Sequence, residues 1–279
     1  MYSTDSYFHI GASHLLGGKP CQDYALDSNQ DGLALAIVAD GCSTGGMTDV
    51  GARLLAHSVK SAIKSIVPIY SPEINYRDTT ILRDIHVNSA MRNLGLSVRD
   101  MQSTCSYVAV HDGKWLCQIY GDGIIVEKYT DGIVFMTQVQ WDKNLPYYPI
   151  YTGNVLEEFK MAHDKETPFT WETWVFDPES DAEKYLTEDA GLGVERAIRE
   201  GYRLSHGSDD ELESIAVFTD GVAQIEGIDW KDVVMSLMSF KTTEGSFLKR
   251  RMISELKKLA KAGHKNIDDI AGAVVRYEG

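Results

Sequence analysis

Three short apolar runs in the chain each lead into an aspartate that has a glycine beside it. Runs of this length and composition predict buried strands, and an aspartate flanked by glycine predicts a turn that projects a carboxylate at the strand end. The runs and their aspartates are Leu33–Ala39 with Asp40, residues 115–120 with Asp122, and residues 214–219 with Asp220. A further strand is predicted at residues 271–277, after Asp268 and Asp269. Acidic side chains therefore recur at strand boundaries along the chain.

Helical periodicity marks three other segments. Residues 48–66 carry apolar side chains at helical spacing, and Pro68 is expected to stop this helix. A second helix is predicted over residues 79–101. A third is predicted over Phe247–Ala262, where lysines occupy the last turns and Gly263 follows as a C-cap. We expect all three helices to pack against the strands.

The order of these elements indicates one domain of the α+β class. Strands dominate, helices are grouped in a few places, and no repeat of fixed period or low-complexity linker divides residues 1–279. The segment 140–176 is rich in Trp and Tyr and contains three prolines. We expect strands and loops beside the core there. A flap or docking face is the alternative, although core packing is favoured because aromatic side chains bury large areas.

Composition and charge exclude several classes of protein. The chain is 43% hydrophobic and 24% charged, as in an ordinary globular protein. Its 41 acidic and 27 basic residues give a net charge of −14, which disfavours binding to nucleic acid or to anionic lipid. The amino end has no signal-peptide pattern, and no apolar run approaches the ~20 residues of a membrane helix. We therefore expect a soluble cytoplasmic protein.

The four cysteines and the aspartates suggest different kinds of chemistry. The cysteines lie far apart without a CxxC pair, which favours buried free thiols over a zinc site or disulfides. Asp23, Asp40, Asp220 and Asp268 instead form a set of carboxylates spread through the chain. Hard divalent cations such as Mg²⁺ and Mn²⁺ prefer oxygen ligands of this kind. Each motif alone is an ordinary turn, so the argument depends on their combination.

The ordered combination of motifs resembles the PPM (type 2C) metal-dependent protein serine/threonine phosphatases, specifically their compact bacterial branch. The resemblance spans roughly residues 11–277 and is thin between about 130 and 213. It is carried by Gln22-Asp23, Asp40-Gly41, Gly121-Asp122, Asp220-Gly221 and Asp268-Asp269. It implies a four-layer α/β/β/α sandwich of two antiparallel sheets flanked by helices. It also implies hydrolysis of phosphoserine or phosphothreonine by a water that bridges two Mn²⁺ or Mg²⁺ ions.

The same resemblance assigns roles to individual residues. Asp40 would bridge both metals, and the Gly41 carbonyl would bind one of them. Asp220 and Asp268 would hold the other metal, while Asp23 would act mainly on the metal-bound water. Asp122 would belong to a third, weaker metal site, and Asp269 is expected to support its loop instead of binding metal. A phosphoprotein substrate, a cognate serine/threonine kinase and a monomeric state are the partners and assembly that we expect.

The chain departs from the family pattern at two places. Many members have Asp-Gly-His-Gly-Gly, whereas Cys42 stands here in place of the histidine that is thought to protonate the leaving group. Cys42 is interpreted as a packed thiol, because no base is adjacent to it in sequence. The family also places a phosphate-binding arginine upstream of Gln22-Asp23. Here Lys19 is the nearest cation and His14 is the second candidate.

Three other functions remain as alternatives. A haloacid-dehalogenase-type phosphatase would use Asp40 as a nucleophile, but it needs a second aspartate at the position of Cys42. A catalytically weak or inactive pseudophosphatase would bind a phosphoprotein, and the missing histidine keeps this reading open. The same metal site could also hydrolyse a small phosphate ester.

Overall fold

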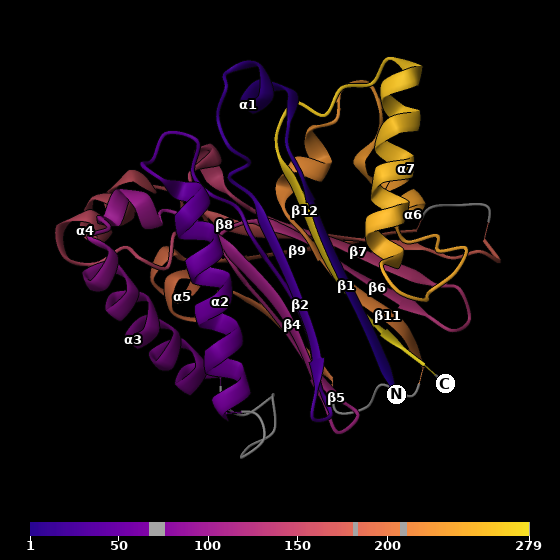
Figure 1. The fold of residues 1–279 in the computed structure, drawn as a ribbon, viewed down its shortest axis with the longest axis horizontal. Coiled ribbons are helices and arrows are strands. Elements are labelled where there is room, and N and C mark those ends of the chain that lie inside the picture. The colour runs from indigo at the N-terminus through magenta and orange to yellow at the C-terminus, as the bar shows by residue number, and fades with distance from the viewer. Residues whose placement is uncertain (67–75, 181–183, 207–210, 279) are drawn as a thin grey trace.

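The computed structural model describes residues 1–66, 76–180, 184–206 and 211–278. Two antiparallel sheets stack face to face, and helices cover the outer face of each (Figure 1). One sheet has the order β1 (Tyr2–His9), β12 (Ile270–Tyr277), β11 (Leu212–Phe218), β6 (Gly123–Tyr129), β7 (Val134–Trp141), β8 (Phe169–Phe176) and β9 (Lys184–Leu192). The other has the order β10 (Tyr202–His206), β5 (Lys114–Tyr120), β4 (Cys105–His111), β3 (Leu33–Ala39) and β2 (Tyr24–Gln30).

The helices occupy distinct positions around the sheets. On the β2–β5 side lie α2 (Thr48–Ile66) and α3 (Tyr76–Leu94), and on the β11–β12 side lie α6 (Trp230–Leu237) and α7 (Phe247–Ala262). The remaining helices are α1 (Ala12–Leu16), α4 (Gly153–Ala162) and α5 (Val194–Glu200), with single 3₁₀ turns η1 (Val98–Met101), η2 (Asp142–Asn144) and η3 (Asp220–Gln224). This arrangement confirms the predicted α+β sandwich of four layers. None of the helices in the described ranges is long and apolar enough to cross a membrane.

The burial of β3 shows why a continuous apolar run is needed in this fold. All seven of its residues are buried. Because side chains alternate across a strand, Ala34, Ala36 and Val38 enter the core between the two sheets. Leu35 and Ile37 enter a second core beneath α2. A strand covered on both faces leaves no position for a polar side chain.

The other sheet is covered in the same way. Its inner face sends Ile125, Ile215 and Val217 into the central core. Its outer face sends Ile124 and Phe218 into a third core, which α6 and α7 close with apolar residues such as Val234, Leu248 and Met252. The helical periodicity of residues 247–262 therefore reflects packing against this sheet, as predicted.

The predicted helices are confirmed in two cases and corrected in one. Helices α2 and α7 have the expected bounds, and Gly263 ends α7 in the left-handed conformation with φ 95°. Pro68, which was expected to stop α2, lies outside the described residues. The predicted helix over 79–101 is instead two elements, because the chain turns at Gly95 with φ 69° between α3 and η1.

The aromatic segment 140–176 contains the end of β7, η2, α4 and β8. Trp141 lies against Phe159 and Phe169, with ring centroids 5.1 and 5.0 Å apart. All three side chains belong to the core between the sheets, as does Tyr147. Core packing is therefore the main role of these aromatic residues. Helix α4 within the segment was not predicted.

Candidate active site

The strand registers bring the predicted aspartates to one end of the two sheets. In the β2–β5 sheet, the start of β2 pairs with the end of β3, and the start of β4 pairs with the end of β5. In the other sheet, Phe218 at the end of β11 lies beside Ile124 near the start of β6 and Gly272 near the start of β12. Asp23, Asp40, Asp122, Asp220 and Asp268 flank these strand ends. This is the end of the sandwich where α1 lies (Figure 1).

Three of these carboxyl groups are in direct contact. The side chains of Asp23 and Asp220 both lie within hydrogen-bonding reach of the Asp40 carboxyl. Burial raises the pKa of Asp23, Asp40 and Asp220, and the charges of the neighbouring aspartates raise it further.

Asp122 and Asp268 complete the cluster without such a contact. Burial raises the pKa of Asp122, and the charges of Asp220, Asp23 and Asp268 add to that effect. Oδ1 of Asp122 is buried and has no hydrogen-bond partner. A buried carboxylate oxygen without a donor carries a desolvation cost that a bound cation would remove.

The cluster has the donor chemistry of a site for hard divalent cations. Its side chains contribute carboxylate oxygens only, which Mg²⁺ and Mn²⁺ prefer. Among the described residues, no three His, Cys, Asp or Glu side chains already surround one point in the manner of a metal site. The charges of neighbouring aspartates nevertheless raise the pKa of Asp40, Asp122 and Asp220, so a cation bound among these carboxylates would be stabilised by them. The residues therefore fit metal ions by charge and by donor type.

Threonines that the sequence did not single out hold the aspartates in place. The Thr219 hydroxyl donates to Oδ2 of Asp23 at 2.6 Å and accepts the backbone N–H of Ala271 at 2.8 Å. The backbone N–H of Asp40 donates to the Thr104 hydroxyl at 3.3 Å. Thr219 and Thr104 each sit next to a strand end, where a hydroxyl can reach the neighbouring strand.

Gly41 allows the loop after Asp40 to approach its neighbours closely. A Cβ at this position would lie 2.8 Å from the backbone oxygens of Gln22 and Thr48. Gln22 also reaches the same region with its side chain, which donates to the Thr48 hydroxyl at 2.6 Å. The Asp-Gly pattern is therefore explained here by crowding between backbones, in addition to any role of the Gly41 carbonyl.

Asp269 is the centre of a buried hydrogen-bond network behind the cluster. Its carboxylate accepts the backbone N–H groups of Gly11 and Gln22, each at 2.6 Å. His14 places Nδ1 2.8 Å from Oδ2 of the same carboxylate. Asp269 is 1% exposed and His14 is 6% exposed. The structure thus gives Asp269 the supporting role that was predicted, and it places His14 beside Asp269.

Two exposed cations lie at the loop that follows Asp40. Nζ of Lys19 donates to the Ser43 carbonyl at 3.3 Å, and Nη2 of Arg99 donates to the Thr44 carbonyl at the same distance. Lys19 was predicted as a candidate, whereas Arg99 was missed. Arg99 belongs to η1, far from the aspartate motifs in sequence, so only the fold brings it to this loop.

Cys42 is half-buried in the same loop, close to Tyr148 of the aromatic segment. Burial acts to raise the pKa of the Cys42 thiol, but hydrogen bonds from Thr44 and Tyr148 and from the backbone outweigh it, so the pKa is lowered. Burial raises the pKa of Tyr148, and the charges of Cys42, Asp40 and Asp122 contribute. The aromatic segment therefore contributes one side chain to the site, which its sequence did not indicate.

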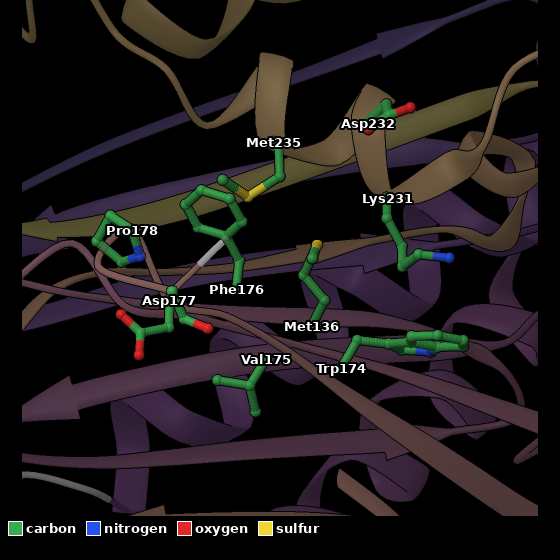
Figure 2. A pocket seen from close by; sticks show the side chains of 10 residues that line it. Met136, Trp174, Val175, Phe176, Asp177, Pro178, Lys231, Asp232 and Met235 are labelled. Carbon is green, nitrogen blue, oxygen red and sulfur yellow. The ribbon is translucent and has the colours of Figure 1, made fainter. Parts of the chain in front are cut away.

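A separate hollow lies away from the aspartate cluster. It has a volume of about 370 Å³ and lies between β8 and α6, with Met136, Trp174 and Met235 among its lining residues. Figure 2 shows its two carboxylates, Asp177 and Asp232, on opposite sides of the hollow. Because its acidic groups do not converge, this hollow lacks the chemistry of the aspartate cluster.

Comparisons with known proteins agree with the fold. Among solved structures, a Streptococcus agalactiae serine/threonine phosphatase aligns with a TM-score of 0.57 at 18% identity, over 100% of both chains. Serine/threonine phosphatase Stp1 from Staphylococcus aureus gives 0.57 at 12% identity, over 100% of this chain and 96% of that one. PppA, a regulatory component of the type VI secretion system (T6SS) in Pseudomonas aeruginosa, gives 0.53 at 18% identity, over 99% and 97%. At such identities these likenesses establish the fold alone.

The sequence itself supplies the family. No curated protein matches the chain significantly. The model of the family described as "Protein phosphatase 2C" matches residues 10–267. This range is most of the chain and includes Asp23, Asp40, Asp122 and Asp220. The two-sheet sandwich agrees with this match. The chain belongs to the protein phosphatase 2C family.

Proposed function

We propose that this protein is a metal-dependent phosphatase that hydrolyses phosphoserine or phosphothreonine on proteins. The observation that carries the proposal is the convergence of Asp23, Asp40 and Asp220 from three separate strand ends, with the other two carboxyls within hydrogen-bonding reach of Asp40. A structural cluster of that kind costs stability, because burial raises the pKa of each carboxyl. Such a cost is typical of a functional site.

The residues proposed to hold the metals are the same as those predicted. Asp40 is proposed to contact two Mn²⁺ or Mg²⁺ ions, and its position between Asp23 and Asp220 supports this role. Asp220 and Asp268 are proposed for one ion, the Gly41 carbonyl for the other, and Asp122 for a weaker third. When bound, the ions supply an activated water and neutralise charge on the phosphoryl oxygens.

The protein itself contributes position and charge around the cluster. Asp23 is held by the Thr219 hydroxyl and is poised to accept a proton from the attacking water. Lys19 and Arg99 lie on the exposed side of the loop after Asp40 and are proposed to orient the substrate phosphate. Arginine can do so with two parallel hydrogen bonds, whereas lysine acts as a point charge.

A second candidate function rests on Cys42. A thiol stands where many family members have the histidine that is thought to protonate the leaving group. A protein that binds phosphoproteins with little or no turnover is therefore the alternative. Measuring whether the folded wild-type protein turns over substrate separates the two functions.

The test measures hydrolysis of p-nitrophenyl phosphate and of a phosphothreonine peptide with Mn²⁺, Mg²⁺ or a chelator. Asp40→Asn and Asp220→Asn should each abolish the metal-dependent rate. Asp112→Asn is the matched control, because Asp112 lies in an exposed turn with φ 50° that asparagine also tolerates. No turnover from folded wild-type protein in any metal would support the non-catalytic alternative instead.

A further inference from the structure

A second site of opposite charge lies on the outer helical layer, between α7 and the loop that precedes it. It is a hollow of about 280 Å³. Its lining includes two aromatic rings and four cationic side chains: Phe240, Phe247, Lys241, Arg250, Arg251 and Lys258. It belongs to the end of α7 that is remote from Asp268, since the chain reaches the aspartate cluster only after α7 ends.

The positive charge of this hollow is only partly neutralised by the protein. Arg251 and Lys258 share one carboxylate, that of Glu255, at 3.1 and 2.6 Å. Arg250 donates to the backbone carbonyl of Glu244 at 2.7 Å, which leaves its charge uncompensated. Within the described part of the chain, neither Arg250 nor Lys241 forms an ion pair with a carboxylate.

One wall of the hollow is rigid. Nε of Arg251 donates to the Ser236 carbonyl at 2.6 Å, and Nη2 donates to the Ser236 hydroxyl at 3.2 Å. These bonds tie α7 to the end of α6. Phe240 and Phe247 pack edge to face, with ring centroids 5.0 Å apart. The aromatic pair thus forms the apolar floor of the hollow and Arg251 is held in place beside it, and preorganised groups of this kind lose little entropy on binding.

We propose that this hollow is a docking surface for an acidic segment of a partner protein, with an aromatic or aliphatic side chain seated against Phe240. The positive charge of this hollow contrasts with the chain as a whole, which carries a net charge of −14. Six of its 27 basic residues lie within the 16 residues of α7. The volume is below the ~300 Å³ of ordinary small-molecule pockets, and it suits side chains of a peptide.

Two arguments distinguish this ligand from other polyanions. A nucleic acid would be repelled by the remaining acidic surface as it extended beyond the hollow. A short acidic peptide can place its carboxylates on Lys241 and Arg250 and its apolar residue on the floor. Binding at this hollow does not require the aspartate cluster, so peptide binding can be measured independently of phosphatase activity.

The test uses fluorescence anisotropy with a labelled peptide of alternating Asp and Glu around one phenylalanine. The double variant Lys241→Glu/Arg250→Glu should weaken binding at least about tenfold. Lys60→Glu, on α2 in the opposite helical layer, should leave it within about twofold. A peptide with serine in place of phenylalanine should bind about tenfold more weakly than the original.

Several results would overturn the proposal. These are an absence of peptide binding by wild type, an equal loss in the Lys60→Glu variant, or tighter binding of a single-stranded oligonucleotide than of the peptide. Thermal unfolding of each variant shows whether the fold is intact. If charge reversal at position 250 disrupts it, Arg250→Gln replaces that variant and should still weaken binding several-fold.

Discussion

Asp268 and Asp269 are adjacent in sequence but have opposite environments. Asp268 is half-buried and faces the aspartate cluster, where its charge acts on Asp122 and Asp220. Asp269 is turned inward and accepts N–H groups from two segments near the amino end. Its carboxylate therefore fixes the position of Gln22, and hence of Asp23, relative to Asp268. Residues with no contact to substrate can set the spacing of a metal site in this way.

Asp269→Ala tests this supporting role. It would leave the backbone N–H groups of Gly11 and Gln22 without an acceptor, so we expect the free energy of unfolding to fall by about 2 kcal/mol. Asp269→Asn keeps one acceptor oxygen and should lose less. Urea unfolding with Asp112→Asn as an exposed control measures the effect. If the free energy of unfolding of Asp269→Ala lay within about 0.5 kcal/mol of the wild-type value, the supporting role of Asp269 would be contradicted.

The aspartates of the site could be predicted from the sequence, whereas their supports could not. Asp40, Asp122 and Asp220 each follow an apolar run and have a glycine beside them, which is a local signal. Thr219 and Thr104 lie next to strand ends and carry no local signal until the fold places them beside another segment. The positions of Arg99 and Tyr148 depend on contacts between distant segments, and no local pattern encodes those contacts.

At the scale of elements, the loop between β3 and α2 depends on η1. Asp100 accepts the backbone N–H of Met47 at 2.8 Å, and it also accepts the backbone N–H and the hydroxyl of Ser97 at 2.8 and 2.6 Å. One carboxylate therefore caps η1 and the start of α2 together. These hydrogen bonds lower the pKa of Asp100. The loop that carries Gly41 and Cys42 ends at this cap.

Asp100→Ala should destabilise the protein by about 1 kcal/mol at pH 7, because two helix starts lose their cap. Asp100→Asn keeps one acceptor oxygen, so it can satisfy only one of the two backbone N–H groups and should lose less stability than Asp100→Ala. The folded pKa is depressed, so the contribution is complete above the unfolded pKa of about 3.9 and is lost as pH falls through the folded value. Urea unfolding from pH 7 downward measures this difference. A gap between wild type and Asp100→Ala that widens toward acid pH would contradict it.

Element boundaries were predictable where packing and local signals agree. Helices α2 and α7 have long amphipathic patterns, and their bounds were correct. The segment 79–101 has mostly polar residues, so its periodicity did not reveal the turn at Gly95 between α3 and η1. Strand β1 also escaped prediction, because its residues alternate only weakly between buried and exposed. Its position is set by pairing with β12, at the far end of the chain.

At the scale of the whole molecule, the clustered aspartates make the stability of the fold depend on pH. Burial raises the pKa of Asp23, Asp40, Asp122 and Asp220, so the folded protein holds protons more tightly than the unfolded chain does. Wherever the folded state binds more protons, stability falls as pH rises. Burial also raises the pKa of Glu127 to about 7, at a position between the sheets and apart from the cluster.

In a chelator, the melting temperature should therefore be highest at mildly acid pH and should decrease toward pH 8. Mn²⁺ or Mg²⁺ should raise it far more at pH 8 than at pH 5, because ions bind the deprotonated carboxylates. Asp122→Asn should melt about 3 °C above wild type in chelator at pH 8 and respond less to cations. Glu127→Gln is the discriminating control, since it should reduce the pH dependence but keep the full cation response. Calorimetry of wild type, Asp122→Asn and Glu127→Gln at pH 5 and pH 8 measures these melting temperatures. Equal cation responses in wild type and Asp122→Asn would exclude Asp122 from the metal site, and no response in wild type would exclude the site itself.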